Sequence, residues 1–548
     1  MHRIRHRRAL LGAAALALAA CSPSPNPSSG FVLPATITAT PFRPVAPSPT
    51  PAEVTLWIAP EIPVPVAERV LGAAAASDIP LRQVETPGEA SVRLEPDGAE
   101  TVADWTYALV APFPTVEDGM SIEALRAAWA GEGGPPIFIE DDDAPALKLL
   151  LGVPGQNVVV GSEGALLDAA WSSRPSRAII PFDALEPRWK VLQLNGTSIL
   201  TREEDLTAYP LELSLGLSGA PEAIEWFRSS LETSEGTVPI VNRSPQRMTT
   251  LVMTGVTALT RATAWQMDRS GMTFPARDIG DWLRTADITH ISNEVSFTEA
   301  CPDPIPDQTR LLFCSSPRHI ALLEEVGTDV VELTGNHVLD AGEQAFLGSL
   351  DLYRERGWVW FGGGTDLDEA TQPALFEHNG NRIALLGCNE AGPVSAWAAY
   401  EEPGATPCGP DRLKADITAL RESGYLPIFT FQWHEHYAPT APASQREAFL
   451  AAAQAGAVGV SGSQAHQPQG FAFRDGAFIH YGLGNLFFDQ MWSNAVRQEF
   501  IDRYVFHDGR LISVELLTAY LEDWARPRPM TPEERAAFLD EMFRASGW

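Results

Sequence analysis

The chain has 548 residues, more than one domain normally contains, so two or three domains are expected. Its hydrophobic content of 45% supplies enough apolar side chains for real cores, and its charged content of 20% is ordinary for globular protein. The formal net charge of −31 argues against a surface that binds nucleic acid or anionic lipid, because both need cationic patches.

Residues 1–21 are predicted to be an export signal. A basic segment, His2 to Arg8, precedes an apolar run, Ala9 to Ala20, that is too short to span a bilayer. The run ends in Leu18-Ala19-Ala20-Cys21, which resembles the signal of bacterial lipoproteins. This resemblance implies cleavage before Cys21, lipidation of Cys21 and an exported protein anchored to the cell membrane. An ordinary secretory leader and a twin-arginine signal at Arg7-Arg8 are the alternatives.

Residues 22–52 are rich in proline, serine and threonine, which predicts an extended linker without a core. Only four cysteines follow, and an even number in an exported chain suggests disulfides. Their spacing favours the pairs Cys301–Cys314 and Cys388–Cys408, although four cysteines allow three pairings.

Residues 53–237 alternate between strand-like and helical patterns, which predicts an α/β domain. The strand-like runs are Val54–Ile58, Tyr107–Val110, Pro136–Ile139, Asn157–Val160 and Ala178–Ile180, and the helical ones are Val66–Ala76, Ile122–Ala130 and Gly164–Ala170. The segments Ser121–Gly131 and Pro181–Leu185 resemble parts of periplasmic solute-binding proteins, particularly the phosphate-binding type. The resemblance implies that fold and identifies no ligand-binding residue.

A boundary is predicted between Glu235 and Arg247, and residues 247–517 continue as a second α/β domain. The expected strands are Thr249–Thr254, Ile288–Ser292, Val330–Leu333, Ile428–Phe431, Val458–Val460 and Phe478–Tyr481, and the expected helices are Ala258–Asp268, Ile279–Arg284, Pro317–Val326, Glu343–Arg356, Asp411–Ser423 and Gln445–Ala455. His507-Asp508-Gly509, between two apolar runs, predicts a hairpin. Residues 518–548 are predicted to form a mostly helical tail.

Polar side chains crowd the points where successive strands of the second domain end. In a parallel α/β layer these ends share one edge, where ligands bind. The candidate site residues are Asn293, Glu294, Asn336, His337, Asp340, Gln432, His434, His436, Gln464, His466 and Asn485. Imidazole, carboxylate and amide oxygen together form the ligand set of Zn, Mn or Fe in hydrolytic centres. The alternative is that each is a turn, cap or rim residue with no shared function.

Three runs in this domain carry a family resemblance. They are Leu333-Thr334-Gly335-Asn336-His337-Val338-Leu339-Asp340-Ala341-Gly342, Gly462-Ser463-Gln464-Ala465-His466 and His480-Tyr481-Gly482-Leu483-Gly484-Asn485-Leu486-Phe487-Phe488-Asp489. Their order resembles the CapA-like capsule-synthesis family, which is associated with poly-γ-glutamate capsules. The resemblance covers roughly residues 249–517 and implies a metallophosphatase-like, calcineurin-type α/β sandwich that holds one or two divalent metals.

The resemblance also implies roles for individual residues. His337 would be catalytic, with Asp340 orienting it, while Glu294 and Asn336 would bind metal. His466, the histidine that remains of a motif whose first inner histidine is replaced here, would also bind metal.

Three departures from the family pattern weaken the implied metal centre. Val256 stands where a ligating aspartate ends the first strand, Gln432 leads the run that normally begins with histidine, and Gln464 replaces the missing inner histidine. Valine cannot bind a metal, and glutamine is a weak neutral ligand. His434 and His436 are therefore predicted to supply a rearranged site.

Two functions remain open on the sequence. One is a metal-dependent hydrolase or transferase that acts on cell-envelope polymers or their phosphorylated precursors. The other is a non-catalytic lipoprotein whose degenerate site binds a capsule-like polymer or a partner protein.

Overall fold

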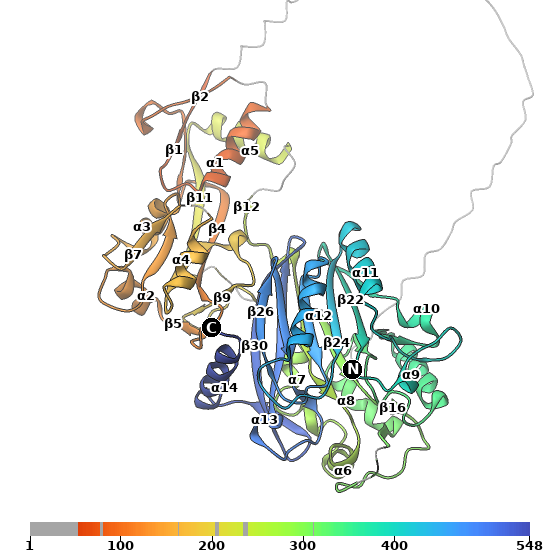
Figure 1. The fold of residues 1–548 in the computed structure, drawn as a ribbon. Helices are drawn as coiled ribbons and strands as arrows, with labels where there is room; N and C mark the ends of the chain where they lie inside the picture. The colour runs from red at the N-terminus through yellow and green to blue at the C-terminus, as the bar shows by residue number, and fades with distance from the viewer. Residues whose placement is uncertain are drawn as a thin grey trace, which may run out of the picture. The chain divides into compact units, whose positions relative to one another are not determined.

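The computed structural model describes residues 53–548 except 77–79, 163, 203–205, 207, 234–238, 309 and 311; of residues 230, 232 and 233 only the backbone is described. The predicted signal, linker and lipidated Cys21 therefore lie outside the described residues. Within the described part, no helix combines the length and the apolar character needed to cross a membrane. Figure 1 shows the described chain as a first half, coloured orange to yellow, and a second half, coloured green to blue.

The first half is built on one mixed sheet crossed by the long strand β4. In sheet order its strands are β2 (Leu81–Gln83), β1 (Val54–Ile58), β3 (Val92–Pro96), β11 (Glu212–Gly219), β4 (Glu100–Pro112), β8 (Arg177–Pro181), β6 (Ile137–Glu140) and β7 (Val158–Gly161), with β9 (Trp189–Val191) and β12 (Ile240–Val241) also paired to β4. Its helices are α1 (Val64–Ala75), α2 (Ile122–Trp129), α3 (Ala144–Leu151), α4 (Leu166–Ser172) and α5 (Pro221–Thr233). The predicted α/β class of this half is confirmed.

The second half contains two large sheets. The first has the order β19 (Val359–Phe361), β18 (Val330–Glu332), β15 (Ile288–Asn293), β13 (Met248–Thr254), β29 (Gln498–His507), β30 (Arg510–Glu522) and β31 (Arg526–Pro529), with β14 (Val256–Thr257) joining β15 to β28 (Asn485–Phe487). The second has the order β21 (Ala374–His378), β22 (Asn381–Asn389), β24 (Leu426–Gln432), β25 (Gly459–Ser463), β27 (Ala477–Gly482) and β26 (Gln469–Arg474).

The two sheets pack face to face. Successive side chains of a strand point to opposite faces, so neighbouring residues show what each face of a sheet contacts. Val330 and Ile428 belong to the apolar cluster shared by both sheets. Their neighbours Val331 and Phe429 belong instead to two outer clusters, each formed with helices. The predicted two-sheet α/β sandwich is therefore present.

Helices cover the outer face of each sheet (Figure 1). On the first sheet these are α6 (Arg261–Ser270), α7 (Gly280–Arg284), α8 (Ala321–Glu325) and α9 (Glu343–Arg356), and on the second they are α11 (Pro410–Glu422) and α12 (Ala443–Gln454). The remaining helices are α10 (Leu367–Ala370), α13 (Asn494–Arg497) and α14 (Pro532–Ala545). In α9, Phe346, Leu350 and Tyr353 are buried, and left-handed Gly357 ends the helix.

Residues 518–548 differ from the predicted helical tail. Strand β30 continues to Glu522, β31 pairs antiparallel with it, and only then does α14 begin. Pro527 and Pro529 of β31 argue against a strand in the sequence, because proline has no N–H to donate. An edge strand tolerates such residues. The hairpin predicted at His507-Asp508-Gly509 joins β29 to β30.

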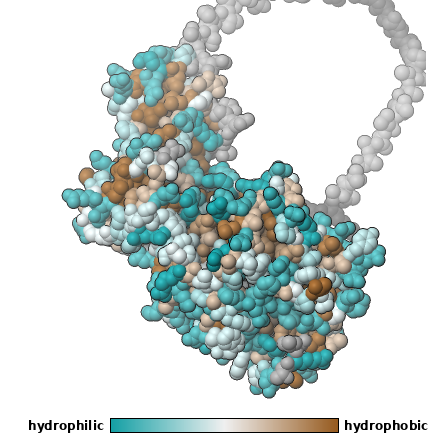
Figure 2. All heavy atoms as spheres, viewed as in Figure 1, coloured by the Kyte–Doolittle hydropathy of each residue, from teal (hydrophilic) through white to brown (hydrophobic). Residues whose placement is uncertain are grey.

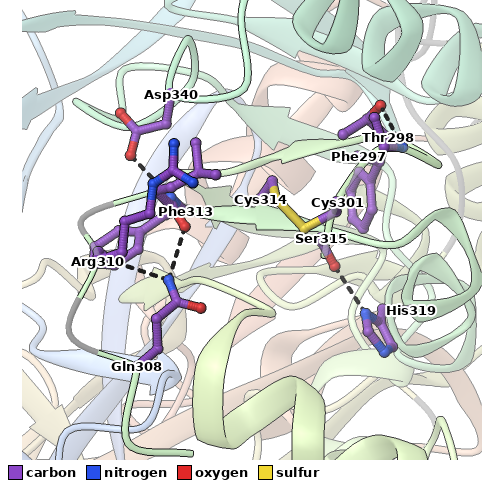
Figure 3. The surroundings of a disulfide bond; sticks show 12 residues. Phe297, Thr298, Cys301, Gln308, Arg310, Phe313, Cys314, Ser315, His319 and Asp340 are labelled. Atoms are coloured by element: carbon purple, nitrogen blue, oxygen red, sulfur yellow. Dashed lines mark hydrogen bonds between the residues drawn. A yellow bond between two sulfur atoms is a disulfide. The ribbon is translucent and has the colours of Figure 1, made fainter. Parts of the chain in front are cut away.

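Both predicted disulfides, Cys301–Cys314 and Cys388–Cys408, are present. The first closes the loop between the short paired strands β16 (Ser296–Phe297) and β17 (Cys314–Ser315), as Figure 3 shows. Two disulfides favour an oxidising, extracytoplasmic compartment.

Candidate functional site

The site lies where strands of both sheets end. Strands β15 and β18 run parallel in one sheet, and β24 and β25 run parallel in the other. The side chains that meet beyond these ends are Glu294 after β15, Asn336 after β18, Gln432 at the end of β24 and Gln464 after β25.

Gln432 lies at the centre of this group. Its Nε2 is 3.1 Å from Glu294 Oε2, 3.1 Å from Asn336 Oδ1 and 2.6 Å from Gln464 Oε1. Glu294, Gln432 and Gln464 are buried, so their hydrogen bonds face little competition from water. Four of the predicted site residues thus share one hydrogen-bonded network.

Gly335 allows the loop after β18 to lie directly against this network. A Cβ at Gly335 would be 2.6 Å from Glu294 Cα, which is closer than two carbons can approach. Asn389, at the end of β22, donates from its Nδ2 to Thr334 O at 2.7 Å. Thr334 Oγ1 donates in turn to the buried Glu332 Oε1 at 2.6 Å. The backbone that carries Asn336 and His337 is therefore fixed on both sides.

His337 and Asp340 form a pair beside the network. His337 Nδ1 is 2.8 Å from Asp340 Oδ2, and the same oxygen accepts the Phe313 N–H at 3.0 Å (Figure 3). The Phe313 ring lies 4.3 Å from the imidazole. Burial disfavours the charged imidazole, but the hydrogen bond to Asp340 and the charge of Glu294 outweigh it and raise the pKa of His337 above its ordinary value.

His466 lies on the other side of the site. Its Nδ1 is 2.9 Å from Asn485 Oδ1, and its Nε2 is 3.7 Å from Oε1 of the exposed Glu435. Both His466 and Gln464 have positive backbone φ angles, 53° and 74°, which residues other than glycine rarely adopt. Backbone of this kind concentrates at functional sites, where surrounding contacts hold it in place.

Arg261 joins the two sides and was not predicted. Its guanidinium carbon is 4.7 Å from the Phe313 ring and 5.0 Å from the Phe488 ring, and the group pairs with Asp489. Phe313 contacts His337, while Phe488 lies 5.4 Å from the His466 ring. Asp489 ends one of the sequence runs that resemble the family. The residues around Arg261 form no such motif, so the Arg261–Asp489 pair could not be predicted.

Three other predicted residues make their contacts elsewhere. His434 is exposed beside Trp433, and His436 Nε2 lies 3.2 Å from Thr440 O within its own loop. Asn293 Nδ2 donates to Val295 O and to Tyr353 Oη, both at 2.8 Å, and so faces α9. The structure therefore does not bring these three side chains to Gln432.

The residues at this edge do not fit a Zn, Mn or Fe centre. An amide nitrogen, which carries hydrogens and offers no lone pair to a metal, lies where the oxygens converge. Val256, where a carboxylate would be needed, is buried in an apolar cluster with Ala258, Val295, Phe313 and Phe488. In the part of the chain that the structure describes, no three His, Cys, Asp or Glu side chains are arranged to hold a metal ion.

Two solved structures match part of this chain at low identity and low TM-score. A phosphate transport receptor from Vibrio cholerae is 12% identical, covering 33% of this chain and 94% of the receptor, with a TM-score of 0.28. A 5'-nucleotidase precursor from Thermus thermophilus is 14% identical, covering 55% of this chain and 58% of the nucleotidase, with a TM-score of 0.31.

Sequence comparison relates the second half to known proteins. The capsule biosynthesis protein CapA of Bacillus anthracis is 23% identical over 309 residues, 55% of this chain and 74% of CapA. A probable polyglutamine synthesis accessory protein of Mycobacterium tuberculosis is 24% identical over 250 residues, 42% of this chain and 65% of that protein. Residues 250–490 match the model of the bacterial capsule synthesis protein PGA_cap. This part of the chain therefore resembles the CapA-like family of bacterial capsule synthesis proteins.

Proposed function

We propose that the protein is an extracytoplasmic accessory component of polyglutamate-type capsule synthesis or attachment, and that its site binds the polymer or a precursor without metal-dependent hydrolysis. The relatives' names support the pathway, and the lack of fit to a metal supports binding over hydrolysis.

The observation that carries the proposal is an open pair of aromatic side chains at the edge of the polar site. Tyr437 is 42% exposed and Trp492 is 63% exposed, and their rings meet edge to face at 4.9 Å. The Tyr437 ring also lies 6.4 Å from the His466 ring, nearly parallel to it. An exposed aromatic pair thus continues directly from the buried hydrogen-bonding groups.

This combination suits a polymer of γ-linked glutamate. Each repeat of its main chain has an amide group, a carbon that carries a carboxylate, and two methylenes, so the methylenes can pack on aromatic faces while the amides find hydrogen-bonding partners. Tyrosine and tryptophan are enriched among the residues that dominate binding energy. The face shown in Figure 2 is largely hydrophilic, and the net charge of −31 repels a polyanion at long range. Short-range contacts at the aromatic pair therefore have to supply the affinity, and added salt should speed association.

The test is a binding assay with fluorescent poly-γ-glutamate oligomers. Trp492→Ala and Tyr437→Ala should each weaken binding about tenfold, the usual effect of removing an anchoring aromatic residue. Tyr400→Ala is the matched control, because Tyr400 is an aromatic residue 82% exposed in the segment between β22 and β23 (Gly404–Ala405). Equal affinities of wild type and Trp492→Ala would reject the proposal.

A second candidate function, hydrolysis, is favoured by the His337–Asp340 pair. An imidazole held by a carboxylate is a common general acid or base. Incubation with poly-γ-glutamate and with phosphoesters, each with and without added Mn, separates the candidates. Turnover that His337→Ala abolishes would establish hydrolysis and displace the binding function.

Membrane anchoring through Cys21 is part of the proposal. Leu18-Ala19-Ala20-Cys21 supports it. In a bacterial host, Cys21→Ala should move the full-length protein from the membrane fraction to the soluble fraction, and an unchanged membrane fraction would contradict the anchor.

A further inference from the structure

Oxygen atoms that should repel each other converge at the centre of the site. Three oxygens, those of Glu294, Asn336 and Gln464, all lie within 3.1 Å of one atom, Gln432 Nε2. One of these oxygens belongs to a buried carboxylate. Oxygens with facing lone pairs repel each other unless a positive group lies between them, and in metalloproteins that group is a cation.

Here an N–H₂ group takes that position. A side-chain amide has two hydrogens, so it bonds two of the three oxygens fully or shares its hydrogens among all three. Hydrogen bonds to a charged carboxylate are stronger than those between neutral groups.

The residues around the site also argue against a bound cation. Val256 lies on the strand that pairs with both β15 and β28, and it is fully buried in an apolar cluster. His466 Nδ1 is engaged by Asn485. Val256 therefore offers no ligand to a cation, and the atom on which the three oxygens converge is an amide nitrogen.

We infer that the Gln432 side-chain amide replaces the metal ion of the fold family, so that this edge is assembled by hydrogen bonds and binds no divalent metal. The opposing model turns the Gln432 amide over. Its Oε1 would then join the other three oxygens, and only a bound cation would hold four oxygens together. The two models make opposite predictions for metal content.

Two substitutions at position 432 distinguish the models. Gln432→Glu keeps the shape but replaces the N–H₂ by a second carboxylate oxygen, which creates the four-oxygen site. Gln432→Met keeps the approximate size and removes both donor and acceptor. Gln445→Glu is the matched control, because the buried Gln445 Nε2 donates to Gln469 Oε1 at 2.9 Å and Tyr481 O at 2.7 Å, in an equivalent two-acceptor arrangement.

The full chain is purified from cells grown with Mn, Zn and Ca, and its metal content and Tm are measured with and without EDTA. Wild type should carry far less than one metal per chain, and EDTA should leave its Tm unchanged. Gln432→Met should lower the Tm whether or not EDTA is present. Gln432→Glu should gain a Tm increase with added Mn or Ca that Gln445→Glu lacks.

Other results would overturn the inference. A wild type that retains one equivalent of metal, or loses Tm on EDTA treatment, would mean that a cation holds the oxygens. A Gln432→Met variant with the Tm of wild type would mean that the amide holds nothing. If Gln432→Glu fails to fold, the wild-type and Gln432→Met measurements still decide between the models.

Discussion

The position of Glu294 depends on a residue that has no side chain. Gly335 faces Glu294, and the positions of Cα and Cβ of Glu294 leave no space for a methyl group on Gly335. The contact joins the loops after β15 and β18, which carry the carboxylate and the amide that meet at Gln432. The sequence marked both loops by their polar residues, but it could not reveal that Gln432 is the centre, because side-chain direction depends on packing between the two sheets.

Gly335→Ala should force these loops apart and lower the free energy of unfolding by about 1–3 kcal/mol. Gly348→Ala is the control, since Gly348 lies in α9 with open space around its Cβ position. That change should leave stability equal or raise it by about 0.5–1 kcal/mol, because alanine favours helix. Denaturant unfolding measures both. A Gly335→Ala variant as stable as wild type would contradict the close contact.

The buried Asp143, in the first half, should make the stability of the protein depend on pH. Burial raises its pKa most strongly; the Tyr107 hydroxyl, which donates to Oδ1 at 3.1 Å, lowers it, and nearby acidic groups raise it, leaving a pKa of about 7. The unfolded chain releases this proton near its ordinary pKa of about 4. The stability that the group contributes is therefore complete below about pH 4 and is lost as the pH rises to about 7.

Asp143→Asn should remove this loss. The variant should exceed wild type by up to roughly 4 kcal/mol above pH 7, and the difference should vanish near pH 4. Asp141→Asn, at an exposed position whose charge is not among those that shift the pKa of Asp143, should keep the pH dependence of wild type. The measurement is denaturant unfolding from pH 4 to pH 8, and parallel pH curves for wild type and Asp143→Asn would refute the assignment.

Among the elements, the loop closed by Cys301–Cys314 has the most direct connection to the site. Phe313 immediately precedes Cys314 and donates its N–H to Asp340 (Figure 3). Its ring also packs on the His337 ring. Cys388–Cys408 is a natural comparison, because it closes a loop of similar length elsewhere in the same half.

Removing either disulfide by paired Cys→Ser changes should cost about 2–4 kcal/mol. The Cys301/Cys314 change should alter the environment of His337 more strongly, because that loop carries Phe313, which bonds Asp340 and packs on the imidazole, whereas the Cys388–Cys408 loop reaches the histidine only through the Asn389–Thr334 hydrogen bond. The His337 ring signals in an NMR spectrum measure this effect. Identical His337 signals in the two double variants would show that the loop does not position the histidine.

The elements themselves were predictable where apolar runs were long or hydrophobic residues recurred at helical spacing, as in β15 and α9. Strand β22 was missed because its apolar run Ile383–Leu386 is short and a polar segment opens it. β31 was missed because its prolines suit only the edge position that its pairing with β30 provides. In both cases the strand is specified by its neighbours more than by its own residues.

At the scale of the whole molecule, the two halves share apolar and charged contacts. Phe113 of the first half is buried among aromatic rings of the second, 5.7 Å from Phe471 and 5.2 Å from Phe473. Nearby, a cavity of about 230 Å³ is lined by Asp118, Lys190 and Arg535. The sequence predicted two α/β domains, but contacts between residues several hundred positions apart leave no local pattern.

Asp118 holds a cation from each half. Its Oδ1 is 2.8 Å from Lys190 Nζ and 2.8 Å from Arg535 Nη2, and its Oδ2 is 3.0 Å from Arg535 Nε. Lys190 is largely buried, which lowers its pKa, although Asp118 opposes that shift and leaves the pKa at about 8. Without Asp118, two cations would face each other at the junction.

Asp118→Ala should therefore weaken the coupling between the halves. Because Asp118 is half exposed, the expected cost is modest, about 1 kcal/mol. Calorimetry should show the unfolding transition broaden or split as the halves begin to unfold separately. Glu186→Ala is the control, since it removes a pair with Arg188 that lies within the first half. If Asp118→Ala and Glu186→Ala give the same single transition as wild type, the apolar contacts around Phe113 alone couple the halves.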